Sequence, residues 1–134
     1  MTLLLDTHTV LWVTEDNPRL GRVARRACDV ALAADEVAVS TIAYYEIGQL
    51  LKRTRDGGAP SVRDWRMRIL SLGVRELELT AEIAVRASDL ENLPRDPIDR
   101  FIVATALVQQ AVLLTADELI LSWPGPLKRQ DARR

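Results

Sequence analysis

The chain has 134 residues, of which 48% are hydrophobic and 28% are charged. This composition fits a single globular domain over residues 1–134 and excludes an intrinsically disordered chain. One cysteine and one histidine exclude an internal disulfide and a zinc site built from paired thiolates or imidazoles, so a metal site in this chain has to be made of oxygen ligands.

The first residues carry no basic segment and reach an aspartate after five positions, which does not resemble a secretory signal. The longest apolar window, residues 101–115, is interrupted by Gln109 and Gln110 and is too short to span a bilayer. We therefore expect a cytoplasmic protein without a membrane segment.

Apolar runs alternate with helical spacings along the whole chain. The predicted elements are a strand at 3–5, a helix at 10–13, a helix at 23–34, a strand at 37–39, a helix at 42–54, a helix at 61–72, a half-exposed edge strand at 74–79, a helix at 80–90, a helix at 96–110, a strand at 112–115 and a short helix at 118–121. This alternation predicts an α/β fold, a three-layer α/β/α sandwich around a mainly parallel sheet. The prolines and glycine at 123–126 exclude a regular helix there, and the sequence leaves open whether the C-terminal segment adds a strand.

Four acids share one kind of position in this pattern. Asp6 and Asp117 directly follow buried strands, while Glu46 and Asp99 lie early in helices that follow a strand or a loop. If the fold brings these four carboxylates within a few ångströms of one another, they repel by roughly several kcal/mol, and a divalent cation removes this cost. Each acid also has a simpler interpretation: Asp6 ends a strand, Glu46 reaches water at the edge of its apolar stripe, and Asp99 and Asp117 stabilise helix N-termini.

The same residues form motifs that resemble those of PIN-domain toxins of the VapC family. The matching segments, in order, are LLLDTHTVLW at 3–12, STI at 40–42 leading to EI at 46–47, DPIDRFIVATA at 96–106 and TAD at 115–117. Two positions depart from the family pattern, because Ile98 stands where an aromatic residue is common and Thr105 where glutamine is frequent. Neither departure affects an acid.

The resemblance implies the toxin of a type II toxin–antitoxin pair, an endoribonuclease that depends on Mg²⁺ or Mn²⁺. Carried over to this sequence, the catalytic and metal-binding residues are Asp6, Glu46, Asp99 and Asp117, with Asp96, Thr115 and Thr7 in supporting roles. The resemblance also implies a PIN-like fold, a VapB-like antitoxin as partner, an RNA substrate and a homodimer.

Three alternatives to a ribonuclease remain open at this point. An aspartate-nucleophile phosphatase needs a second aspartate two residues after the first, where this chain has His8. A non-catalytic binding module of the same fold would be expected to have lost acids, and none is missing here. A DNA nuclease is compatible with the same metal chemistry. His8 is a candidate substrate contact, and Arg100 is expected to pair with a neighbouring acid, with a phosphate contact as the alternative.

Two segments concentrate the basic residues. Residues 52–68 hold six basic residues against two acidic ones, and residues 128–134 hold four against one. Such patches suit a polyanion, although a solvated helix face and a frayed tail explain them equally well. Because metal-binding acids repel RNA, we predict that Lys52, Arg53 and Arg55 contact its phosphates.

Overall fold

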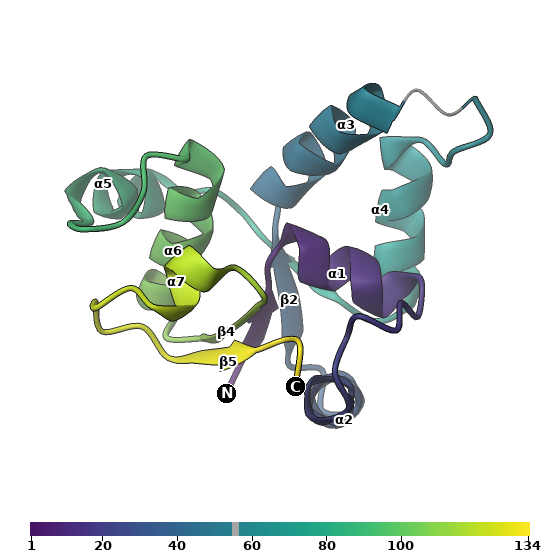
Figure 1. Cartoon of the computed structure of the whole chain (residues 1–134), viewed down its shortest axis with the longest axis horizontal. Coiled ribbons are helices and arrows are strands. Elements are labelled where there is room, and N and C mark those ends of the chain that lie inside the picture. The colour runs from purple at the N-terminus through teal and green to yellow at the C-terminus, as the bar shows by residue number, and fades with distance from the viewer. Residues whose placement is uncertain (55–56) are drawn as a thin grey trace.

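The computed structural model describes residues 1–54 and 57–134, and within them the five strands form one wholly parallel sheet (Figure 1). The strands are β1 (Leu3–Leu5), β2 (Val37–Ser40), β3 (Arg75–Leu77), β4 (Val112–Thr115) and β5 (Arg129–Asp131). Their order across the sheet is β3-β2-β1-β4-β5, so β1 is central. The predicted α/β/α sandwich with a parallel sheet is confirmed.

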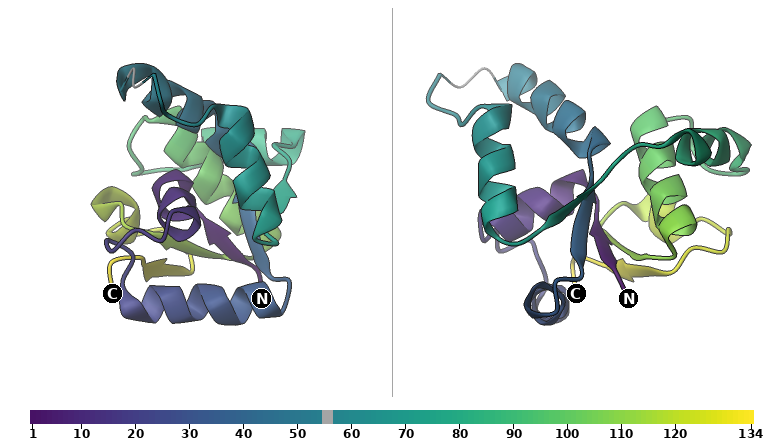
Figure 2. Two further views of the ribbon diagram at one scale, coloured as in Figure 1. Left: turned by 90° about the vertical axis from the view of Figure 1, so that its right-hand side faces the viewer. Right: turned by 180° about the vertical axis from the view of Figure 1, so that it is seen from behind.

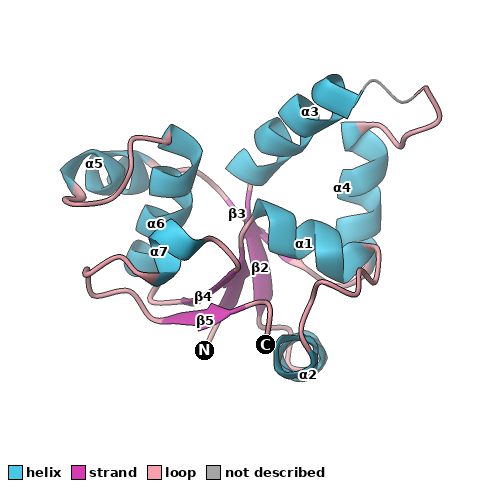
Figure 3. Cartoon of the chain, in the orientation of Figure 1, coloured by secondary structure: helices cyan, strands magenta, loops and turns pink. Residues whose placement is uncertain are grey.

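Helices cover both faces of this sheet (Figures 1 to 3). One side carries α1 (Thr7–Thr14), α2 (Arg22–Ala33), α3 (Ile42–Thr54) and α4 (Val62–Ser71), and the other carries α5 (Ala81–Asp89), α6 (Pro97–Gln109) and α7 (Glu118–Leu121). No helix within the described ranges is both long enough and apolar enough to cross a membrane.

The central strand, β1, is a run of three leucines because both of its faces are covered by helices. Leu3 and Leu5 pack into the core under the first group of helices, and Leu4 packs into the core under α6 and α7. Both faces of β1 are therefore buried, and all three leucines are at most 7% exposed.

Polar side chains at the helix starts satisfy backbone N–H groups that have no partner inside the helix. Thr80, Asp96 and Asp117 accept such hydrogen bonds at α5, α6 and α7, and Ser61 does so at α4. Asp6 caps α1 in the same way, so α1 begins at Thr7, three residues before the apolar pattern that predicted it.

The C-terminal segment forms a strand, β5, a point that the sequence left open, with a frayed tail as one interpretation of its charges. The Leu113 N–H donates to the carbonyl oxygen of Lys128 at 2.9 Å, and the Ala132 N–H donates to that of Thr115 at 2.8 Å. The strand is only three residues long and its sequence, Arg-Gln-Asp, has no apolar alternation. The open edge of β4 supplies its hydrogen bonds, and this edge exists only in the folded chain.

Arg100 pairs with no acid among the described residues, contrary to expectation. Its guanidinium donates hydrogen bonds of 2.6 to 3.1 Å to the carbonyl oxygens of Ala87, Leu90 and Leu93. These carbonyls belong to the last turn of α5 and the loop after it. Arg100 therefore fastens α5 and that loop to α6.

Candidate active site

A cavity of about 440 Å³ opens where the carboxyl ends of β1 and β4 meet. After β1, the chain adds β2 and β3 next to one edge of β1, and later adds β4 and β5 next to its other edge. The strand order therefore reverses at β1, and open α/β sheets bind ligands at such a switch point. The cavity is lined by Asp6, Thr7, His8, Trp12, Glu46, Asp96, Asp99, Ile102, Ala116, Asp117 and Arg133. The structure thus brings the four predicted acids and Asp96 to one place.

Asp6 is the most buried of these acids, at 8% exposure. One carboxylate oxygen, Oδ1, accepts the Thr9 N–H at 2.9 Å, and the other, Oδ2, accepts the Thr115 hydroxyl at 2.5 Å. Burial raises the pKa of Asp6, and the hydrogen bonds from Thr115 and Thr9 oppose that rise. The carboxylate is therefore held in one orientation at the floor of the cavity.

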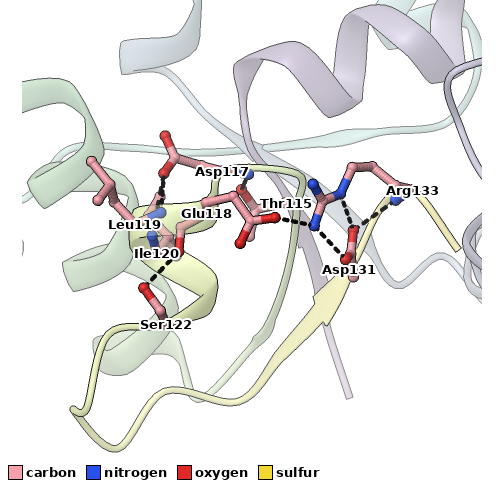
Figure 4. Close-up of polar contacts among 8 residues, drawn as sticks. All are labelled: Thr115, Asp117, Glu118, Leu119, Ile120, Ser122, Asp131 and Arg133. Atoms are coloured by element: carbon pink, nitrogen blue, oxygen red, sulfur yellow. Dashed lines mark hydrogen bonds and ion pairs between the residues drawn. The ribbon is translucent and has the colours of Figure 1, made fainter.

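Thr115 connects two of the acids. While its hydroxyl donates to Asp6, the same oxygen accepts the Asp117 N–H at 3.0 Å. Asp117 in turn caps α7, because its Oδ1 accepts the N–H groups of Leu119 and Ile120 at 2.8 and 3.2 Å (Figure 4). A single buried hydroxyl thus connects the residue after β1 with the cap of α7.

Asp99 carries the clearest electrostatic signature of the site. Its carboxyl group is half-buried, and Asp96, Asp117, Glu46 and Asp6 all lie near enough to repel a negative charge on it. Burial first, and then these like charges, raise the pKa of Asp99 to about 7. Asp96 is exposed, and its Oδ1 accepts the N–H groups of Ile98 and Asp99 as the cap of α6.

Glu46 lies on α3 between the buried residues Ala43 and Ile47, as the apolar stripe predicted. Its side chain is only half-buried, however, because it lines the open cavity instead of the core. Glu46 therefore reaches water at the edge of the apolar stripe, as one expectation held. It also lines the same cavity as the other acids, as the other expectation held.

The donors in this cavity fit a hard divalent cation. All five acids offer oxygen, and the hydroxyl of Thr7, 1% exposed, is buried at the cavity without a hydrogen-bond partner among the described residues. Within residues 1–54 and 57–134, no three His, Cys, Asp or Glu side chains are grouped so that they could hold a metal ion by themselves. An ion here would keep several waters and use only some of the acids as direct ligands, as Mg²⁺ commonly does.

Asp99→Asn should stabilise the chain in the presence of a chelator, more at pH 8 than at pH 5. The folded carboxyl keeps its proton to about pH 7, whereas the unfolded one loses it near the ordinary pKa of 3.8, so wild-type stability falls as the pH rises between these values. With allowance for solvent screening of a half-exposed group, the gain at pH 8 is about 1–2 kcal/mol. Urea unfolding at the two pH values measures it.

Asp64→Asn is the matched control, because Asp64 occupies the same third position in α4 that Asp99 occupies in α6. Backbone and side-chain hydrogen bonds with Ser61 lower the pKa of Asp64, so its charge stabilises the fold above the unfolded pKa. The control should lose stability at pH 8. Equal changes in the free energy of unfolding in the two variants would show that the effect of Asp99 comes from its position at the helix N-terminus and not from the neighbouring acids.

The two predicted RNA contacts that the structure describes, Lys52 and Arg53, lie outside the cavity. Lys52 and Arg53 are exposed in the last turn of α3 and do not line it, and Arg55 lies outside the described residues. Arg133 and Trp12 line the cavity, yet sequence reasoning did not assign them to it. The resemblance included Trp12 in its first motif, whereas no local pattern singled out Arg133.

A second hollow, of about 460 Å³, lies between α2 and the N-terminal strand. Its lining is mainly aliphatic, and Glu36, the one acid among the described residues there, pairs with the N-terminal amine at 3.3 Å. It has no group of acids comparable to those beside Asp6, so the chemistry is assigned to the cavity at the switch point.

The fold and its acid-lined cavity define a parallel α/β protein of the PIN-domain family, to which the chain belongs, since residues 3–122 match that family. The chain is 34% identical to ribonuclease VapC22 of Mycobacterium tuberculosis, over 93% of this chain and 94% of that protein. Its fold is similar to VapBC-1 of nontypeable Haemophilus influenzae, with a TM-score of 0.68, 22% identity and full coverage of both chains. It is also similar to VapBC2 of Rickettsia felis, solved with a promoter DNA fragment, with a TM-score of 0.71, 13% identity and coverage of 97% and 98%.

Proposed function

We propose that this protein is an endoribonuclease that needs Mg²⁺ or Mn²⁺ and acts as the toxin of a VapBC-type toxin–antitoxin pair. The observation that carries the proposal is the meeting of Asp6, Glu46, Asp99 and Asp117 in one cavity, together with the identity to a curated VapC ribonuclease over nearly the whole chain. Asp96, Thr115 and Thr7 support these acids from the same cavity or directly beneath it.

The reaction is hydrolysis of an RNA phosphodiester, in which a P–O bond forms to water and the ester P–O bond breaks. Asp6 and Asp99 would hold the ion, with Glu46 and Asp117 completing its shell or a weaker second site. When bound, the ion lowers the pKa of water and offsets charge on the phosphate. Thr115 fixes the Asp6 carboxylate, and Trp12 and Ile102 add apolar surface to the lining of the cavity.

Incubation of the purified chain with total cellular RNA, with Mg²⁺ or Mn²⁺ and with excess chelator, tests the proposal. Cleavage that requires the ion supports it, and cleavage that persists in chelator contradicts it. Single-stranded DNA of the same sequence tests the DNA-nuclease alternative. Binding of RNA without cleavage under any ion condition would instead indicate a binding module.

An antitoxin and a second toxin chain are the proposed protein partners. The solved relatives include several described as VapBC or toxin–antitoxin complexes. On this chain, Tyr45 on α3 and Met67 on α4 are 60% and 67% exposed, so the helices around Glu46 offer apolar contacts to an antitoxin segment. A basic side chain of that segment would reach the acids.

Light scattering of the isolated chain is expected to give about twice the mass of one 15.0 kDa subunit. The apolar residues Val23 and Val30 on α2, each more than 60% exposed, give this helix an apolar surface that a second subunit would cover. A monomer at every concentration would contradict the homodimer without affecting the nuclease proposal.

Lys52→Gln/Arg53→Gln should weaken RNA binding several-fold without moving the cleavage position. The two side chains lie only about 10 Å along α3 from Glu46, at a rise of 1.5 Å per residue, so one RNA strand can touch both the patch and the site. Loss of two phosphate contacts on a single strand should lower the slope of log K against log salt by about 1.4.

Arg22→Gln/Arg26→Gln on α2 removes the same charge from exposed positions away from the acid-lined cavity and serves as the control. Affinity and salt slope that change equally in both double variants would mean that only net charge matters. An unchanged slope in the α3 variant would identify the patch as a solvated helix face.

A further inference from the structure

The acid-lined cavity contains one strongly basic side chain, and it comes from the last residues of the chain. Among the described residues that line the cavity, Arg133 is the single arginine or lysine. Arg133 lies on the segment that follows β5 (Figure 4). The acids would repel an RNA phosphate, so a cation inside their cavity is a feature that needs a physical explanation.

The backbone around Arg133 is fixed on both sides. The residue before it, Ala132, is fully buried, and its N–H donates to the Thr115 carbonyl oxygen at 2.8 Å. The main-chain oxygen of the residue after it, Arg134, accepts the Ala24 N–H at 2.9 Å. A Cβ at Gly21 would lie 2.0 Å from that oxygen, so the closely packed backbone requires glycine there. Arg133 is thus held in place by the tertiary structure.

The guanidinium is held in one orientation by two acids. Nε and Nη2 donate to the two carboxylate oxygens of Asp131 at 2.9 and 2.8 Å, and Nη2 also contacts Glu118 Oε1 at 2.6 Å (Figure 4). The backbone N–H of Arg133 adds a bond to Asp131 Oδ1 at 2.9 Å. Nη1 has no hydrogen-bond partner among the described residues. The bidentate contact with Asp131 therefore leaves the Nη1 side of the guanidinium available to a ligand.

The two ion pairs differ in strength. The side chain of Asp131 is 19% exposed, whereas that of Glu118 is 71% exposed, so the contact with Glu118 is screened by water and easily exchanged. A phosphate that enters the cavity can displace Glu118 from Nη2, while Asp131 holds the guanidinium in the same orientation. Arginine suits this task because its planar, permanently charged donors match phosphate oxygens.

We propose that Arg133 is a substrate-binding residue that holds a phosphate of the RNA backbone inside the acid-lined cavity, through Nη1 and through the Nη2 donor released from Glu118. This inference rests on the proposed ribonuclease function and adds a contact to it. Arg133 acts at the cavity itself, whereas Lys52 and Arg53 act on α3 outside it.

The test measures binding of a single-stranded RNA by fluorescence anisotropy in an Asp6→Asn background, so that cleavage does not interfere. Arg133→Gln should weaken binding about tenfold and lower the slope of log K against log salt by about 0.7. Arg134→Gln removes the same charge from a neighbouring side chain that does not line the cavity, and should leave the slope nearly unchanged. Thermal unfolding checks that each variant is folded.

Two further variants separate a phosphate contact from a structural brace. Glu118→Gln removes the competing acceptor, so it should tighten RNA binding more than Glu82→Gln, which makes the same charge change at an exposed position that does not line the cavity, whereas a brace predicts equal gains. Glu118→Gln/Arg133→Gln has the net charge of the wild type, and it should still bind more weakly than the wild type. This outcome would exclude net charge as the cause.

Unchanged affinity and salt slope in Arg133→Gln, or tighter binding, would overturn the inference. So would a double variant that binds like the wild type. These outcomes leave the proposed function intact if the wild-type chain cuts RNA in the presence of Mg²⁺ or Mn²⁺. A wild-type chain that neither binds nor cuts RNA would overturn both.

Discussion

Asp6→Asn is expected to lower the rate of RNA cleavage by about a thousandfold while the fold is retained. Loss of residues that only orient metal ligands typically costs ten- to a hundredfold, and Asp6 is proposed as a direct ligand. Asparagine caps helices about as well as aspartate, so the bond from the Thr9 N–H and the start of α1 should survive. Single-turnover cleavage with Mg²⁺, together with circular dichroism, measures both parts.

The matched control is Asp29→Asn, the same chemical change at an exposed position on α2 that does not line the cavity. It should cut RNA like the wild type. In addition, Mg²⁺ should raise the melting temperature of the wild type and of Asp29→Asn more than that of Asp6→Asn, because ion binding to the folded state stabilises it. Full activity of Asp6→Asn would contradict the assignment of the site.

Arg100→Met is expected to lower the free energy of unfolding by about 2–4 kcal/mol. The substitution keeps much of the aliphatic stem but removes four hydrogen bonds from a charged donor to three backbone carbonyl oxygens. Hydrogen bonds to charged groups contribute roughly 1.5–3 kcal/mol each, and part of that is recovered when water reaches the freed carbonyls. Urea denaturation in chelator measures the loss.

Arg86→Met on α5 removes an exposed arginine near the same helix pair and should change stability by less than about 0.5 kcal/mol. Arg100 lies one residue after Asp99, so an alternative role in phosphate binding predicts a different result. In that case Arg100→Met would weaken RNA binding and leave unfolding unchanged. That result would contradict the role assigned by the structure.

The acids of the site could be predicted from the sequence because each is marked by local chemistry. Asp6 follows a run of leucines that only a doubly buried strand explains, and Asp96 precedes Pro97 at a helix start. Asp117 likewise caps a helix directly after a buried strand. In a parallel sheet such strand ends meet at one edge, so the pattern itself indicated a shared site.

The partners of the arginines could not be predicted in this way. A long, flexible cation has many possible acceptors along the chain, and which one it meets depends on the packing of distant elements. Arg100 was expected to meet an acid and instead binds backbone carbonyls of α5 and its loop. Arg133 lies 127 positions after Asp6 in the sequence, yet the two residues line one cavity.

What the sequence by itself determined is therefore the succession of strands and helices along the chain, the mainly parallel sheet and which acids line the cavity, because burial pattern and helix capping are encoded within a few residues. The tertiary structure alone decided that residues 129–131 pair with β4, since their polar sequence has no strand pattern and an open sheet edge supplies the hydrogen bonds. It also decided that Arg133 enters the cavity, because that position depends on β5, on Asp131 and on the contact of the C-terminal backbone with α2.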